Sequence, residues 1–185
     1  MSRDSLLAVS LGAHLLLLAG TLWSIARPAR RLWPPPGRDS WQFGATWLLF
    51  AAATASLVWL GLVDWNALGL SPWLRLPAGG LLLGGGLTLS LWGVASLGVG
   101  QALGLEGELR VSGPYRFSRN PQYVGDIAAT LGWAVLTGSP RVGAVAVVAT
   151  LWYAVLPASE EPWLEERFGE EYRRYRRRVP RFFPD

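Results

Sequence analysis

The chain contains no cysteine and a single histidine, and all 17 of its basic residues are arginine. Without cysteine it can form no disulfide, use no thiolate in catalysis and offer no cysteine-ligated metal site. The sequence also lacks a cluster of metal-ligating residues, a glycine-rich phosphate loop after a strand, and a Ser/His/Asp arrangement. The lone His14 lies in an apolar segment, where a packed polar side chain is a simpler interpretation than a ligand. We therefore expect no bound metal.

Charge is absent from three long stretches, at residues 6–26, 43–63 and 77–100. Each reaches the roughly 20 residues that cross the hydrocarbon core of a bilayer. Backbone polar groups in lipid must find partners within their own segment, so each stretch is predicted to be a transmembrane helix. Two shorter apolar runs, 123–137 and 142–156, are separated only by "TGSPR" and predict a tight helical hairpin.

The first apolar segment has two interpretations. Ser24 and Ala26 are small residues placed as they would be before a signal-peptide cleavage site. The apolar part, however, is longer than the roughly 7–15 residues of such peptides. We favour an uncleaved membrane anchor.

After Pro157 the chain becomes strongly charged. Apolar side chains still recur at helical spacing there, while arginines occupy the other faces. This pattern predicts an amphipathic helix that lies along the membrane surface. The apolar positions are Leu164, Phe168, Tyr172, Tyr175 and Val179.

The net charge of +4 is compatible with nucleic acid, but a membrane surface is the better partner for so apolar a chain. With five membrane-spanning helices, fourteen arginines fall on one side of the membrane and three on the other. The arginine-rich side is expected to be cytoplasmic and to hold the C-terminus, in the inner membrane of a bacterium. We predict one all-α membrane domain, residues 1–185, with the first two helices in 1–76 and the candidate catalytic part in 77–185.

Three polar groups are expected at the cytoplasmic ends of the last three helices. They are Gly98 and Gly100, the stretch 112–126, and Glu160 with Glu161. Consecutive segments usually pack side by side, so we predict that these groups share a pocket.

Each group also has a purely structural interpretation. Gly98 and Gly100 can end a helix, Asn120 can cap the next one, and the two glutamates can favour a helix start. Asp126 would lie inside the hairpin, where a carboxylate is costly unless it is paired.

Two longer motifs favour a functional interpretation. "GPYRFSRNPQYVG" and the later "EEPWLEERFGEEYRRYRRRVPRFFP" resemble the isoprenylcysteine carboxyl methyltransferase family, which is related to the membrane phospholipid methyltransferases. The resemblance covers about residues 95–184. Gly98-Val99-Gly100 is also similar to a G-x-G motif of the phospholipid methyltransferases. The matching positions are Gly113, Pro114, Tyr115, Arg119, Asn120, Pro121, Tyr123 and Gly125, then Glu160, Glu161, Leu164, Phe168, Gly169, Tyr172, Tyr175, Val179 and Pro180.

The resemblance implies a pocket for S-adenosylmethionine at the cytoplasmic interface and a lipid or lipidated acceptor that enters from the bilayer. Glu160 or Glu161 would bind the amino group or the ribose hydroxyls, and Arg119 a carboxylate. The cofactor-binding residues it implies are Gly98, Gly100, Tyr115, Arg119, Asn120, Tyr123, Glu160 and Glu161. Arg119, Asn120 and Asp126 are the candidate catalytic residues.

Possible acceptors differ in whether they must lose a proton before they can be methylated. Many eukaryotic members of the family have histidine where this chain has Asn120, so no imidazole is available here as a base. A carboxylate acceptor is already ionised and needs no base, which favours carboxyl O-methylation. A phospholipid amine, the alternative, must first lose a proton, and Asp126 or a glutamate could take it.

Two other classes of protein remain open. Membrane sterol reductases share R-x-P-x-Y-x-G followed by an acid, which Asp126 also matches. A non-catalytic transporter would use Asp126 and His14 as polar sites within the membrane, but we find no internal repeat.

The third apolar segment is rich in glycine. We expect Gly80 and Gly84 to pack against a neighbouring helix. We also expect Gly84, Gly85 and Gly86 to line the entrance for the acceptor.

Overall fold

The structure, a computed structural model, describes residues 1–182, and all of its regular elements there are helical. Phe183 and Pro184, at the end of the second motif, lie outside the described residues. The helical membrane bundle predicted from the sequence is confirmed. Its elements are α1 (Arg3–Ala26), η1 (Pro28–Arg30), α2 (Trp41–Val63), α3 (Pro72–Leu97), α4 (Val99–Ala102), η2 (Gly113–Arg116), α5 (Pro121–Thr137) and α6 (Pro140–Arg178).

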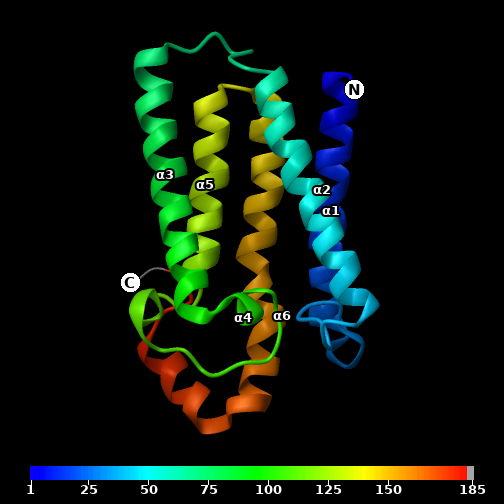
Figure 1. Ribbon diagram of the computed structural model, residues 1–185, viewed down its shortest axis with the longest axis vertical. Coiled ribbons are helices and arrows are strands. Elements are labelled where there is room, and N and C mark those ends of the chain that lie inside the picture. Colours follow the sequence, from blue (N-terminus) through cyan, green and yellow to red (C-terminus); the bar gives the residue numbers. More distant parts are fainter. Residues whose placement is uncertain (183–185) are drawn as a thin grey trace.

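The long helices run alternately up and down, so the two ends of the bundle differ (Figure 1). One end holds the N-terminus, the connection from α2 to α3 and the α5–α6 turn; we call it the N-terminal end. The other holds the connection from α1 to α2, the segment from Gly98 to Asn120, and the last part of α6. We call this the C-terminal end, and fourteen of the 17 arginines belong to its segments.

Four helices, α1, α2, α3 and α6, are long and apolar enough to cross a membrane. The fifth, α5, has 17 residues and is therefore about 25 Å long, against a hydrocarbon core of about 30 Å. It lies beside α3 and α6 (Figure 1). It is the shorter helix of the predicted hairpin, whose second helix, α6, is long enough to cross a membrane.

Helix α6 consists of two helical parts that meet at Gly169, and the predicted amphipathic segment after Pro157 belongs to both of them. The second helix of the hairpin continues through Pro157 and Pro162 as α6 and bends at Gly169, whose φ and ψ are 53° and −125°. A positive φ is readily adopted only by glycine. After the bend the helix turns across the C-terminal end of the bundle, where Tyr172 and Tyr175 are buried (Figure 1). The bend thus brings the end of the second motif beneath the first.

The third helix ends earlier than the predicted segment 77–100. It stops at Leu97 because Gly98 takes a φ of 91°, outside the helical region, and Gly100 belongs to the separate short helix α4. The turn lets the chain cross the C-terminal end of the bundle on its way to α5 (Figure 1).

Small residues let α3 and α5 pack closely. A Cβ atom added at Gly79 or Gly86 would overlap the backbone of α5, and one added at Gly125 or Gly132 would overlap that of α3. The prediction for Gly80 and Gly84 was wrong, because a Cβ there would meet nothing within 4 Å. Gly79, Gly86 and Gly93 recur every seven residues and so share the face toward α5, which Gly80, Gly84 and Gly85 do not.

His14 behaves as a packed polar residue. Its side chain is buried, and its Nδ1 lies 2.8 Å from the carbonyl oxygen of Ser10, one turn earlier in α1.

Candidate active site

A pocket lies at the C-terminal end of the bundle, and polar side chains from both motifs line it. We call it the polar pocket. The start of α5 and the middle of α6 form one side, while α4, the loop after it and the α1–α2 connection contribute the rest. Six predicted site residues line it: Tyr115, Arg119, Asn120, Tyr123, Glu160 and Glu161.

Arg119 and Glu161 form an ion pair on the wall of this pocket. Arg119 Nη1 lies 2.9 Å from Glu161 Oε1, and these side chains are only 10% and 12% exposed. Arg181 adds two contacts to the same carboxylate, at 2.8 and 2.7 Å. Arg119 Nη1 also lies 3.2 Å from the Tyr172 hydroxyl. The arginine and the glutamate, each predicted to bind a ligand, therefore also bind one another.

Glu160 faces a different set of partners. Its Oε1 accepts hydrogen bonds from the indole Nε1 of Trp33, at 2.6 Å, and from the hydroxyl of Tyr123. The Ser24 hydroxyl holds the α1–α2 connection in place near Trp33, because its oxygen accepts hydrogen bonds from the backbone N–H groups of Leu32 and Trp33. Sequence reasoning missed Trp33, which lies 127 positions from Glu160 and outside both motifs.

Contacts with the end of the chain hold the first motif in place. The backbone N–H of Arg119 donates to the carbonyl of Pro180 at 2.9 Å, and Asn120 Nδ2 donates to that of Arg181 at 3.0 Å. Asn120 stands at the N-cap of α5 without a side-chain capping bond. Tyr175 donates to the backbone carbonyl of Tyr115 at 2.6 Å. Burial raises the pKa of the Tyr115 hydroxyl, so this side chain remains a neutral phenol.

Three predicted site residues lie elsewhere. Gly98 and Gly100 do not line the polar pocket, and a Cβ at either would meet nothing within 4 Å. Gly98 precedes α4 and Gly100 belongs to it, and Gln101 of the same helix lines the polar pocket. Asp126 lies within α5, beyond its first turn, and lines a second pocket.

The second pocket lies among the helices and is mainly apolar; we call it the apolar pocket. Its walls come from α1, α2, α5 and α6, with aromatic rings from Trp47, Phe50, Trp152 and Tyr153. None of its lining residues belongs to α3. The glycines at 84–86, predicted to line the acceptor entrance, therefore do not line this pocket.

The two pockets meet at the start of α5. Trp33, Ala102, Gln122 and Tyr123 line both of them. Tyr123 thus faces the apolar pocket while its hydroxyl donates to Glu160. A ligand in the polar pocket would be next to a ligand held between the helices.

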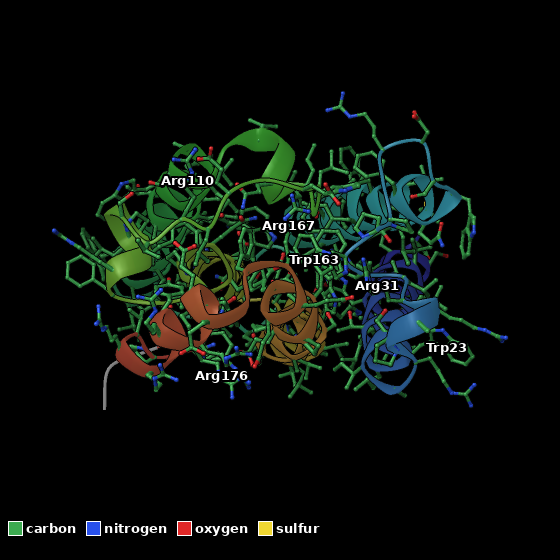
Figure 2. The ribbon with its side chains drawn as sticks, turned by 90° about the horizontal axis from the view of Figure 1, so that it is seen from below. Trp23, Arg31, Arg110, Trp163, Arg167 and Arg176 are labelled. Carbon is green, nitrogen blue, oxygen red and sulfur yellow. The ribbon has the colours of Figure 1, made fainter. Side chains whose placement is uncertain are left out.

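Arginine and tryptophan side chains surround the C-terminal end (Figure 2). Trp163, which lines the polar pocket, has Arg31 and Arg167 near its ring, at 6.0 and 5.8 Å from the centroid. Arg167 also pairs with Glu106 at 2.9 Å, which ties α6 to the loop after α4. No group of three or more His, Cys, Asp or Glu side chains that could hold a metal ion occurs within residues 1–182.

Comparison with known proteins identifies the family. The phospholipid methyltransferase family model matches residues 74–171, more than half of the chain, and the chain belongs to this family. The match begins in α3, earlier than the resemblance seen in the sequence, and ends within α6. It therefore includes most of the polar pocket but not α1, α2 or Trp33.

Three relatives show the range of similar proteins. The chain is 38% identical to the cobalt-zinc-cadmium resistance protein CzcN of Cupriavidus metallidurans, over 53% of this chain and 49% of that protein. It is 34% identical to phosphatidylethanolamine N-methyltransferase of Homo sapiens, over 49% and 48%. It is 29% identical to the steroid 5-alpha-reductase DET2 of Solanum lycopersicum, over 58% and 42%. The chain spans about half the length of these relatives or less. No solved structure matches.

Proposed function

We propose that this protein is an S-adenosylmethionine-dependent methyltransferase that acts on a lipid-borne acceptor at the membrane interface. The observation that carries the proposal is the junction of the two pockets at Tyr123 and Gln122. A polar pocket at the end of the bundle suits a water-soluble cofactor. An apolar pocket between the helices suits an acceptor that arrives from the bilayer. Family membership and the phosphatidylethanolamine N-methyltransferase relative support the same reaction class.

The side chains of the polar pocket fit the groups that the cofactor carries. Glu160 uses only Oε1 within residues 1–182, which leaves Oε2 for an amino group or ribose hydroxyl. Arg119 lines the pocket beside Glu161, so its guanidinium is placed to bind a ligand carboxylate. Tyr115 and Tyr123 offer aromatic surface for adenine. Gly98 and Gly100 would act indirectly, by placing α4 at the pocket wall.

When bound, the cofactor supplies a methyl group on a positively charged sulfur. The residues of the chain then have to align the acceptor and exclude water, which contributes more to such a displacement than a strong base does. Asn120 holds the start of α5 against Arg181, and thereby orients Arg119 and Tyr123. The expectation of carboxyl O-methylation rested on the missing imidazole at Asn120. Asp126 in the apolar pocket weakens that argument, because it is a carboxylate that can accept a proton.

We further propose that the C-terminal end of the bundle is cytoplasmic. Fourteen arginines belong to its segments, and Arg3, Arg75 and Arg141 to the other end. A reporter enzyme active only outside the cytoplasm, fused after Asp185, should stay silent. A strong signal from it would reverse the orientation and place the polar pocket away from the cofactor supply.

Calorimetric titration of the purified protein in nanodiscs tests the cofactor directly. S-adenosylmethionine should bind with one site per chain, and membranes given a labelled methyl donor should yield a labelled lipid extract. Glu165→Gln is the matched control, because Glu165 pairs with Arg173 and Arg176 outside the pocket and should leave binding unchanged. Absence of S-adenosylmethionine binding would refute the proposal. Binding of a nicotinamide cofactor in its place would favour a reductase.

A further inference from the structure

The connection between α1 and α2 carries arginines that lack acidic partners. Residues 27–40 contain four arginines and one acid, Asp39. None of these arginines forms an ion pair within residues 1–182. Figure 2 shows the connection at the side of the C-terminal end away from the last part of α6. It therefore carries a positive charge that the described residues do not balance.

The arginines in the last part of α6 provide a contrast at the same end of the bundle. Arg173, Arg176 and Arg177 each pair with Glu165 or Glu170, at distances between 2.8 and 3.5 Å. We call these three the paired arginines of α6. Their charge is neutralised on their own helix, whereas the charge of the α1–α2 connection is left for a partner outside the described residues.

Three arginines of the connection are held in a defined arrangement. The guanidinium carbon of Arg27 lies 5.3 Å from the centroid of the Trp23 ring. The indole Nε1 of the same tryptophan donates to the backbone carbonyl of Arg30 at 3.2 Å. Arg31 Nε donates to the carbonyl of Pro34 at 3.0 Å. These contacts fix the backbone and two of the side chains before any ligand binds, which reduces the entropy lost on binding.

The end of α1 places an apolar surface directly beside these charges. Leu22, Trp23 and Ile25 are 50%, 45% and 36% exposed, on a helix long and apolar enough to cross a membrane. Arg27 and Arg30 follow at once and are exposed as well. Tryptophan is enriched where the hydrocarbon of a bilayer meets the head groups. The order from apolar side chains to guanidinium groups therefore matches the order from acyl chains to phosphate in a phospholipid.

We propose that Arg27, Arg30 and Arg31, here called the connection arginines, bind the phosphate of an anionic phospholipid whose acyl chains lie along the end of α1. Guanidinium is weakly hydrated and binds phosphate oxygens in bidentate pairs. A zwitterionic lipid also carries phosphate, but its own cationic group would be repelled by the neighbouring arginines. The site thus selects a head group of net negative charge. This binding does not depend on the proposed methyl transfer.

The lipid site adjoins the walls of both pockets. Arg31 is followed by Leu32 and Trp33, which line the apolar pocket, and Trp33 also donates to Glu160 in the polar pocket. The guanidinium carbon of Arg31 lies 6.0 Å from the ring centroid of Trp163 on α6. A phospholipid bound here would therefore hold the α1–α2 connection against α6 and keep these walls in place.

Short-chain lipids test the inference by binding alone. Dihexanoyl phosphatidylglycerol, dihexanoyl phosphatidylcholine and inorganic phosphate are each titrated calorimetrically into the protein in non-ionic detergent, and binding to empty micelles is subtracted. An arginine near an anionic lipid contributes about fivefold in affinity, so phosphatidylglycerol should bind roughly tenfold or more tightly than the other two probes. Added salt should reduce this preference, because it screens exposed charges.

Two triple variants of equal charge locate the site. Replacing the connection arginines by glutamine should abolish the preference for phosphatidylglycerol and leave the unfolding temperature unchanged. Replacing the paired arginines of α6 by glutamine removes the same charge from the same end of the bundle, and should leave the preference intact. Equal loss in both variants would show that the lipid responds to total charge, and would overturn the proposed site.

The remaining outcomes are also decisive. Equal affinity of the wild-type protein for the two lipids would overturn the selection by charge. Inorganic phosphate that binds as tightly as phosphatidylglycerol would overturn the lipid as the ligand. If the triple variant of the connection does not fold, Arg30→Gln decides, since the Arg30 side chain is exposed and forms no ion pair within residues 1–182. A loss of about fivefold in phosphatidylglycerol affinity is then expected, and unchanged affinity would refute the site.

Discussion

Each end of the bundle holds an acidic side chain surrounded by arginine, and the one at the C-terminal end, Glu161, lines the polar pocket. At the N-terminal end, Asp64 is fully buried. Its Oδ1 lies 3.1 Å from Arg141 and 3.5 Å from Arg3, and its Oδ2 accepts from the Ser139 hydroxyl at 2.6 Å. Both oxygens are occupied by groups that join α1, α2 and α6. Such a cluster stabilises the fold and leaves nothing for a ligand.

At the C-terminal end the two acidic side chains, Glu160 and Glu161, have different partners. Glu161 is saturated by Arg119 and Arg181, and resembles Asp64 in that respect. Glu160 receives two hydrogen bonds at one oxygen only and faces the polar pocket. A buried carboxylate that is paired with arginine therefore does not by itself indicate a ligand-binding site. An unsatisfied oxygen or nitrogen next to a cavity does.

Removing Asp64 should have the largest effect on stability. Asp64→Ala leaves the buried Ser139 hydroxyl and the partly exposed Arg141 guanidinium without the carboxylate that each contacts. A hydrogen bond to a charged group contributes about 1.5–3 kcal/mol, so losing both should cost about 3 kcal/mol or more. Unfolding of the purified variant in detergent, followed by temperature, measures this. S-adenosylmethionine affinity of the folded fraction should match wild type. A selective loss of cofactor affinity would show that the two ends are coupled.

The seam between α3 and α5 connects the two ends, and a matched pair of variants tests it. Gly86→Leu must separate the helices because its Cβ would overlap α5, and should cost about 3 kcal/mol or more. Gly85→Leu, one residue away, meets open space and should be tolerated. The yield of monodisperse protein and the unfolding temperature distinguish them. Equal damage from both would contradict the packing described for this seam.

Glu160→Gln should weaken the cofactor and spare the fold. The amide keeps the size of the side chain, and its oxygen can still accept from Trp33 and Tyr123. The charge is lost, however, and a charge-assisted hydrogen bond contributes about 1.5–3 kcal/mol, so affinity should fall roughly tenfold to a hundredfold. Calorimetric titration measures it, with Glu165→Gln as the control. Unchanged affinity would remove Glu160 from the proposed cofactor site.

Trp33→Phe should have the smallest effect of the four. It keeps an aromatic ring at the junction of the pockets but removes the N–H that donates to Glu160. A single hydrogen bond contributes about 0.5–1.5 kcal/mol, which predicts a two- to tenfold loss of cofactor affinity. The same titration detects it. A loss as large as that of Glu160→Gln would mean that the tryptophan contacts the ligand itself.

Uncharged runs and their lengths were enough to predict the helices of the membrane bundle, because lipid leaves the backbone no other way to satisfy its polar groups. Motif residues were likewise enough to place Tyr115, Arg119, Tyr123 and Glu160 in one pocket. These predictions depend on local hydrophobicity and on consecutive helices packing as neighbours. Both can be deduced from the order of residues along the chain.

Other features depend on which faces of the helices meet, and that is decided only when the chain folds. Trp33 reaches Glu160 because the α1–α2 connection folds beneath the bundle. Gly86 packs against α5 while Gly85 faces open space, a difference of about 100° around one helix, at 3.6 residues per turn, which glycine content cannot predict. Arg119 and Glu161, predicted as separate ligand contacts, form an ion pair, and the bend at Gly169 returns the chain so that Arg181 contacts the same Glu161 carboxylate. Long-range contacts of this kind depend on how each helix is rotated about its axis and on the bend. They could not be predicted, because neither feature leaves a periodic signal in the sequence.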